Sequence, residues 1–228
     1  MRHGHAQHND ATEKALAAGK TLMEAALTGG AIRDPALTAK GQAQAKGLAA
    51  DTVLQKSLRA DGSAAEAVVV SPCRRTLQTA VIGLGSAGLP FIAHDSCQEC
   101  SDVPSDTGRP VRELTSEFPS VDFSQIDQPD NWFTKVGPWD FAKDAAKPEG
   151  LMALENRCAR FTAFIAGRPE ECLIVVAHHT FLAFLLALEF ANCEVIECGL
   201  RVDGTWTVLN ARCAKPVTSM PTASVPCD

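Results

Sequence analysis

Residues 67–82 read AVVVSPCRRTLQTAVI, and this stretch decides the fold class. The run Ala67–Val70 is small and β-branched, which predicts a short strand buried on both faces. Ser71-Pro72 then begins a helix through Ile82, because proline is tolerated in a first helical turn. The same order of buried strand and helix returns at residues 173–177 and 180–190. This alternation predicts an α/β domain with a mostly parallel central sheet and helices on both faces.

Other elements are expected on either side of these two units. Helices are expected at residues 11–27, 39–54 (with Thr38 as N-cap) and 151–164, and strands at 89–93, 194–198 and 205–209. Residues 104–150 are rich in proline, aspartate and glycine and lack a clear period, so they are interpreted as an inserted lid region. Residues 1–212 would form the domain, and residues 213–228 a flexible tail.

Composition narrows the class of protein. The 228 residues are 46% hydrophobic and 21% charged with a net charge of −6, which is typical of a globular domain and argues against a broad cationic surface for nucleic acid or anionic lipid. The longest apolar run, residues 181–188, is too short to span a membrane. Nine cysteines, an odd number, favour reduced thiols in the cytoplasm over a secreted disulfide framework. The N-terminus shows no basic-then-apolar signal pattern.

Four short blocks carry chemistry, in this order along the chain: Arg2-His3-Gly4, Ser71-Pro72-Cys73-Arg74-Arg75, Gln98-Glu99 and Ala177-His178-His179. Together they resemble the histidine phosphatase superfamily, also called the phosphoglycerate mutase-like family, from Arg2 to about Asn210. The resemblance implies the fold predicted above and an enzyme that takes a phosphoryl group onto a histidine. The Asp106–Pro110 run is similar to fungal and plant phosphatase-like members rather than to glycolytic mutases.

The resemblance assigns three catalytic roles. His3 would be the nucleophile, since a neutral imidazole nitrogen is available near pH 7 and can form a phosphoramidate. His178 would lie across the pocket from His3 and donate to the phosphoryl group. Glu99 would be the general acid that protonates the leaving oxygen and the base that then activates water. Asp102 and Asp106 lie close enough in sequence to compete for that role.

Three further residues would bind the phosphate. Arg2 and Arg75 offer planar, bidentate donors that match phosphate oxygens. In the family the arginine lies four residues after the serine, which selects Arg75 over Arg74. Asn9 matches an asparagine common at that family position and is expected to contact substrate. The site would need neither a metal nor another cofactor, because arginines and histidines already neutralise a phosphate dianion.

Three other sequence patterns match known ligand-binding motifs, but another interpretation is favoured for each. Residues 83–88, GLGSAG, match the dinucleotide-binding glycine pattern, but they follow a helix and precede a strand, which favours a simple turn. Cys97 and Cys100 have zinc-knuckle spacing without a second pair, so reduced thiols are the better interpretation. His3, His5 and His8 could hold a transition metal, a minor alternative.

The start of the chain raises a separate expectation. Family members place a buried apolar strand directly before the Arg-His-Gly block, and here only Met1 precedes it. Without ladder hydrogen bonds, Arg2 and His3 would be poorly ordered, and an upstream segment or a partner element would have to supply the strand.

The sequence therefore predicts a metal-independent phosphatase that hydrolyses a phosphate monoester, from a small molecule or a phosphopeptide. Two alternatives stay open. A phosphoglycerate mutase would transfer the phosphoryl group instead of releasing it to water, and a binding protein would use the same arginines without turnover. The sequence does not indicate the substrate or the oligomeric state.

Overall fold

A computed structural model describes residues 1–58, 64–135 and 148–210. The α-helices are α1 (Gln7–Ala17), α2 (Leu22–Gly30), α3 (Ala39–Gly47), α4 (Thr52–Ser57), α5 (Arg74–Leu84), α6 (Val111–Glu117), α7 (Pro148–Ala166) and α8 (His179–Leu186). The strands are β1 (Ala67–Val70), β2 (Phe91–Ala93), β3 (Val121–Asp122), β4 (Leu173–Val176), β5 (Glu197–Leu200) and β6 (Trp206–Asn210). No described helix is long and apolar enough to cross a membrane.

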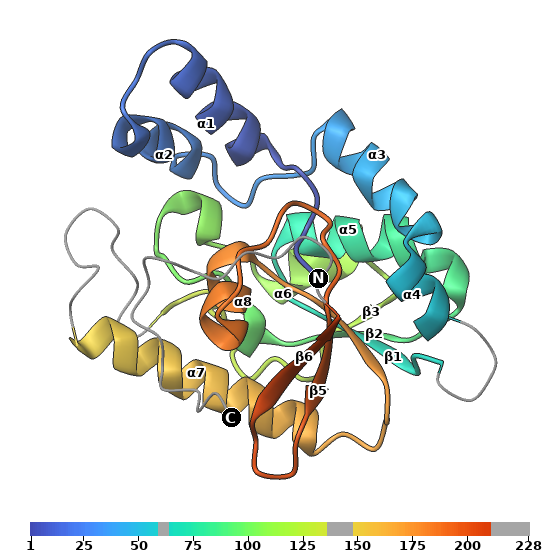
Figure 1. Cartoon of the computed structure of the whole chain (residues 1–228). Helices are drawn as coiled ribbons and strands as arrows, with labels where there is room; N and C mark the ends of the chain where they lie inside the picture. The colour runs from blue at the N-terminus through green and yellow to red at the C-terminus, as the bar shows by residue number, and fades with distance from the viewer. Residues whose placement is uncertain (59–63, 136–147, 211–228) are drawn as a thin grey trace.

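The central sheet has the strand order β3-β2-β1-β4, and all of its pairings are parallel. In its middle, Val69 pairs with Ile92 on one side and with Val175 on the other. Strands β5 and β6 form a separate antiparallel hairpin, red in Figure 1. The predicted parallel sheet is confirmed.

Side chains of β1 point alternately into two cores. Val68 and Val70 pack in the core that contains Leu77 of α5, whereas Val69 packs in the core that contains Phe161 of α7 and Phe181 of α8. Because neighbouring strand residues face opposite sides of a sheet, helices must cover both faces. The prediction that helices cover both faces of the sheet is thereby confirmed as well.

Residues 1–3 are held by the sheet, contrary to expectation. The Met1 amine donates to the Val175 carbonyl at 2.6 Å, the Ala177 N–H donates to the Met1 carbonyl at 3.0 Å, and the His3 N–H donates to the Ala177 carbonyl at 3.0 Å. Arg2 and Ala177 form a parallel bridge. The prediction that this backbone lacks ladder hydrogen bonds and is poorly ordered was therefore wrong, because the exposed edge of β4 supplies the partners.

The N-terminal helical region is two helices where one was predicted over residues 11–27. The first helix ends at Ala17, and Gly19 has a φ of +81°, a left-handed conformation that reverses the chain. Thr21 and Glu24 then form a capping box that begins α2. Figure 1 shows the two helices side by side, in dark blue, standing out from the sheet.

Local signals explain the next helices. Thr38 caps α3 as predicted, since its hydroxyl accepts from the Gly41 N–H at 3.2 Å. The predicted helix over 39–54 is broken where Asp51 caps the separate helix α4. Helix α5 begins at Arg74, after Cys73 as N-cap, a little later than Ser71-Pro72 suggested.

The region predicted as a lid is partly built into the fold. Residues 111–117 form α6, and Val121–Asp122 is β3, the edge strand of the central sheet. Strand β3 could not be predicted from a sequence pattern, because two residues are too few to show a period. Residues 136–147 of that region, and the tail 213–228, lie outside the described residues.

Smaller differences concern the boundaries near the C-terminus. Helix α8 ends at Leu186 instead of residue 190, because Ala187 takes a left-handed conformation with φ of 55°. The late strands lie at 197–200 and 206–210 instead of 194–198 and 205–209. The glycine pattern of residues 83–88 is a helix-to-strand turn as predicted, with Gly88 at φ +70°.

Candidate active site

All of the predicted site residues except Asn9 meet at the carboxyl ends of the parallel strands. Ser71 directly follows β1, His178 follows β4 after Ala177, and His3 is bonded through its N–H to the Ala177 carbonyl. Ligands bind at this edge of open α/β sheets because the strand ends and following helix N-termini converge there. A cavity of about 240 Å³ opens here, and Arg2, His3, Arg75 and Glu99 all line it.

His3 has one defined ring tautomer. Its Nδ1 lies 2.7 Å from the Gly4 carbonyl oxygen, which can only accept, so Nδ1 carries the proton. Nε2 then keeps the lone pair, which accepts a hydrogen bond from Arg75 Nε at 3.3 Å. Burial, followed by the positive charges of Arg75 and Arg2, holds the pKa of His3 well below its usual range. The ring is therefore neutral, with Nε2 available as a nucleophile.

Gly4 is required by a close backbone approach. A Cβ at Gly4 would lie 2.8 Å from the carbonyl oxygen of Gly41 in α3, and a Cβ at Gly41 would lie 1.9 Å from the His5 carbonyl oxygen. Both distances are shorter than real Cβ contacts, so two glycines let the loop after His3 lie directly against α3.

Arg75 is buried and points at His3. Besides its contact with His3, its guanidinium donates to the Ser105 carbonyl at 2.5 Å and to Asp106 Oδ1 at 3.0 Å. A guanidinium has five N–H groups, so three of them are used and two stay available for a phosphate. Asp106 is fixed in turn by the Ser101 hydroxyl at 2.6 Å.

Arg74 faces away from the cavity. Its Nε donates to Glu117 at 2.6 Å and its backbone N–H donates to Asp34 at 2.8 Å. Arg109 completes this network by binding Asp34 at 2.9 Å and Glu117 at 2.8 Å. The structure thus places Arg75 in the site and gives Arg74 the separate task of anchoring the start of α5.

Arg2 approaches the cavity from the other side. One Nη donates to the Phe190 carbonyl at 2.6 Å, and the buried Nε has no hydrogen-bond partner among the described residues. A buried donor without a partner is costly, and a bound anion would satisfy it.

His178 packs against His3, with ring centroids 5.3 Å apart. Its Nε2 lies 2.8 Å from the Ser71 hydroxyl, while no residue in the described part of the chain bonds to its buried Nδ1. Burial, followed by the charge of Arg75, holds the pKa of His178 well below its usual range. The ring is therefore neutral, and its tautomer depends on whether the Ser71 hydroxyl donates to Nε2 or accepts from it.

His179 has different surroundings. Its Nδ1 lies 3.1 Å from the Phe190 carbonyl oxygen and its Nε2 lies 3.2 Å from Glu189. It lines the cavity, but both of its nitrogens are already paired. The structure therefore brings His178, and not His179, into contact with His3.

Glu99 connects the cavity to α8. Its carboxylate accepts backbone N–H groups of Cys100 at 3.0 Å, Thr180 at 3.2 Å and Phe181 at 3.2 Å. The negative charge thus lies at the positive end of the helix. Asp102 and Asp106 also line the cavity, so three carboxylates border it.

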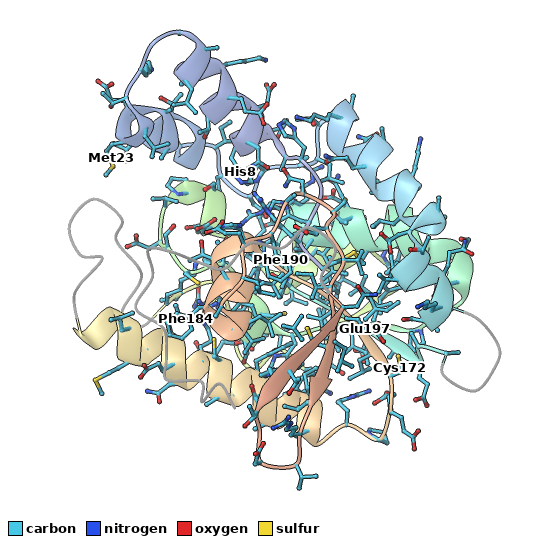
Figure 2. The ribbon with its side chains drawn as sticks, in the orientation of Figure 1. His8, Met23, Cys172, Phe184, Phe190 and Glu197 are labelled. Atoms are coloured by element: carbon cyan, nitrogen blue, oxygen red, sulfur yellow. The ribbon has the colours of Figure 1, made fainter. Side chains whose placement is uncertain are left out.

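Asn9 was expected to contact substrate, and His8 was considered only as a possible metal ligand, but it is His8 that lines the cavity. Asn9 does not line the cavity, and its Oδ1 accepts from the Ala6 N–H at 2.9 Å to cap α1. His8 lines the cavity instead, 5.7 Å from His3 between ring centroids, and Figure 2 labels it on α1. Thr12, four residues further along α1, lies on the same face. Counting four residues along the helix from His8 would have placed Thr12 on the same face as His8.

Burial and the two arginines also affect His8. Burial, then the charges of Arg75 and Arg2, lowers the pKa of His8 to about 2. The site therefore contains three neutral histidines beside two guanidinium groups.

The two suggested metal sites lack a ligand set. Among the described residues, no group of three or more His, Cys, Asp or Glu side chains is arranged to hold a metal ion. His5 instead lies 3.1 Å from Glu13 and 2.8 Å from the Thr38 hydroxyl. Cys97 and Cys100 are buried, and burial raises the pKa of both thiols, so they stay protonated.

Comparison with known proteins matches this arrangement to one family. The model of the histidine phosphatase superfamily, branch 1, matches residues 1–197. The chain is 30% identical over 157 residues to a phosphoglycerate mutase-like protein of Arabidopsis thaliana, a match that covers 56% of this chain and 55% of that protein. The chain spans about half the length of the curated relatives it matches.

Two solved structures have a similar fold. An alpha-ribazole phosphatase from Shigella flexneri aligns with a TM-score of 0.51 at 17% identity, covering 99% of this chain and 98% of its own. A mycobacterial glucosyl-3-phosphoglycerate phosphatase aligns with a TM-score of 0.52 at 17% identity, covering 91% and 94%. The chain belongs to branch 1 of the histidine phosphatase superfamily.

Proposed function

We propose that this chain hydrolyses a phosphate monoester through a phosphohistidine on His3. The observation that carries the proposal is the state of His3: Nδ1 is bonded to the Gly4 carbonyl, and the unprotonated Nε2 accepts only a long hydrogen bond, 3.3 Å, from Arg75 Nε. Nε2 attacks phosphorus while the ester P–O bond breaks, and the leaving oxygen takes a proton from a carboxylic acid. Water then attacks the phosphohistidine, gives its proton to the same carboxylate, and releases inorganic phosphate as the P–N bond breaks.

The surrounding donors suit a phosphoryl group. Arg75 keeps two N–H groups free, Arg2 has an unpartnered Nε, and His178 has an unpartnered Nδ1. If the Ser71 hydroxyl donates to His178 Nε2, the proton of that ring lies on Nδ1, where it can be donated to a phosphate oxygen. Fixed donors of this kind stabilise charge in the transition state without reorganising.

Glu99 is proposed as the acid and base. What supports this role is that Glu99 borders the cavity and that backbone N–H groups of α8 hold its carboxylate in a fixed position there. Asn9 is proposed to act indirectly, by capping the helix that presents His8. No metal or other cofactor is needed in this proposal, because arginines supply the positive charge, and we expect activity to survive EDTA. Cytoplasmic placement is supported by free thiols at all seven described cysteines.

The test is to trap the intermediate. Quenching during turnover without acid should yield a phosphoenzyme that is stable in base and labile in acid, and His3→Ala should abolish it. His94→Gln is the matched control, because His94 stacks on Phe164 at 3.8 Å and does not line the cavity. An acid-stable phosphoenzyme would contradict the proposal.

The two alternatives are separated by turnover. Steady release of phosphate from p-nitrophenyl phosphate distinguishes an enzyme from a protein that only binds phosphorylated ligands. Transfer of the phosphoryl group between phosphoglycerates, with little release to water, would indicate a mutase.

A further inference from the structure

The cavity around His3 has two chemically different halves. Its floor is polar, and the floor residues that line it include Arg2, His3, His8, Arg75 and Glu99. Its rim comes mainly from the hairpin of α1 and α2, residues 7–30, and is apolar along α2 and at the neighbouring Val103, while α1 adds the hydroxyl of Thr12. The rim residues from α2 are Met23, Ala26, Leu27 and Gly30.

These four rim residues lie on one face of α2. Their spacing is i, i+3, i+4 and i+7, which is the repeat of a single helical face. The face that α2 turns toward α1 is a different one, with Ala25 and Gly29 buried. Helix α2 therefore has one face for packing and another for the cavity.

The packing face fixes the rim in place. A Cβ at Gly29 would lie 2.2 Å from Thr12 Oγ1 and 2.4 Å from the His8 carbonyl oxygen, so α2 lies directly against α1 beside His8. The next residue, Gly30, approaches Val103, whose Cβ would be 3.5 Å from a Cβ added at Gly30. The position of the apolar rim above the phosphate site is thus set by contacts on both sides.

The rim side chains have apolar surface that no part of the described chain covers. Met23 is 43% exposed and Leu27 is 55% exposed, and Figure 2 shows Met23 at the outer part of the hairpin. In-line attack by His3 requires the leaving group to lie on the side of phosphorus away from His3. The floor provides His3, so the leaving group extends toward the rim.

We propose that the hairpin of α1 and α2 selects esters with a small, apolar alcohol as the leaving group. The cavity, about 240 Å³, is smaller than the roughly 300–1,000 Å³ of pockets for drug-sized ligands, which suits a phosphoryl group with a short hydrocarbon. Met23 and Leu27 contact that hydrocarbon, and no charged residue of the hairpin lines the cavity to bind a polar alcohol. This inference rests on the proposed function.

The first experiment compares two alkyl phosphates. The substrates 3-methylbutyl phosphate and glycerol 3-phosphate are both esters of primary alcohols, so they differ mainly in the polarity of the leaving group. We expect kcat/KM to be at least about tenfold higher for the 3-methylbutyl ester, the scale of discrimination by an apolar pocket. Equal values, or a preference for glycerol 3-phosphate, would overturn the inference while leaving the phosphatase proposal intact.

The second experiment changes the rim. Leu27→Ser and Met23→Ser should each reduce the ratio of the two kcat/KM values several-fold. Leu22→Ser is the matched control, because Leu22 is on the same helix, is 74% exposed and does not line the cavity. If Leu22→Ser reduces the ratio as much as Leu27→Ser does, the effect belongs to the hairpin's outer surface, and the inference fails.

A binding measurement separates this inference from the proposed function. Alkyl phosphonates cannot be hydrolysed at their P–C bond, so 3-methylbutyl phosphonate and 2,3-dihydroxypropyl phosphonate report recognition alone. We expect tighter binding of the 3-methylbutyl compound, and loss of that preference in Leu27→Ser. If the 3-methylbutyl phosphonate binds more tightly but no ester is hydrolysed, the proposed hydrolysis is contradicted and the inference about the rim stands. If esters are hydrolysed but neither phosphonate is preferred, the inference about the rim is contradicted and the proposed hydrolysis stands.

Discussion

The floor and the rim of the cavity are built by opposite means. The floor is buried and tied by hydrogen bonds: Arg75 is 1% exposed and is held by His3, Ser105 and Asp106. The rim is half exposed and apolar, and the Leu27 side chain has no polar atom with which it could form a hydrogen bond. The difference indicates that chemistry depends on fixed charges and proton positions, whereas substrate choice depends on a surface that can vary without disturbing them.

The largest effect is expected on the floor. His3→Ala removes the nucleophile, and we expect kcat to fall by at least about 10³-fold, as for other enzymes that lose the nucleophile. Leu27→Ser on the rim should change kcat for p-nitrophenyl phosphate far less. Steady-state assays of both variants measure kcat for p-nitrophenyl phosphate. Similar decreases in kcat for the two variants would contradict the distinction between floor and rim.

Arg75→Met should damage both activity and stability. It leaves Asp106 buried beside an apolar side chain, and breaking a buried ion pair costs about 3–5 kcal/mol. The double variant Arg75→Met/Asp106→Asn should recover part of the free energy of unfolding, measured in urea, but none of the activity. Recovery of activity in the double variant would show that Arg75 does not bind the phosphoryl group.

Glu99→Gln should show a leaving-group dependence. An alkyl leaving group needs a proton and p-nitrophenolate hardly does, so the loss should be larger for an alkyl phosphate, within the roughly 10²–10⁴ range of general acid catalysis. Thermal unfolding must be measured in parallel, because the carboxylate also holds the start of α8. Equal losses on both esters would transfer the role to Asp102 or Asp106.

Stability should fall in mild acid. His3, His8 and His178 have pKa values lowered in the folded chain, so below about pH 6.5 the unfolded chain binds more protons than the folded one. The contribution of these three histidines to the free energy of unfolding is fully present above the pKa that they have in the unfolded chain, about 6.5. It is lost as the pH decreases below that value.

The smallest predicted effect isolates one of these histidines. His8→Gln should reduce the loss of unfolding free energy between pH 7.5 and 5.5 by about 1.4 kcal/mol, which corresponds to one pKa unit. Urea unfolding at the two pH values measures it. An unchanged difference would mean that His8 is solvated and does not share the environment of the floor.

The sequence by itself determined what depends on neighbouring residues. The β-branched run of β1, the Thr38 cap and the reversal at residues 83–88 are local, because each follows from conformational preferences or from hydrogen bonds within a few residues. The motif blocks likewise predicted a site at the strand ends, where Arg75 and His178 indeed meet His3.

Only the tertiary structure decided what depends on distant partners. Residues 1–3 are ordered because the edge of β4 supplies hydrogen bonds from more than 170 positions away. Strand β3 exists because β2 offers an edge, and two residues contain no period to read. His8 faces the cavity and Asn9 does not, because a cap hydrogen bond and the packing of α2 at Gly29 fix how α1 is rotated. Such contacts join segments that are far apart in the chain, so no local pattern encodes them.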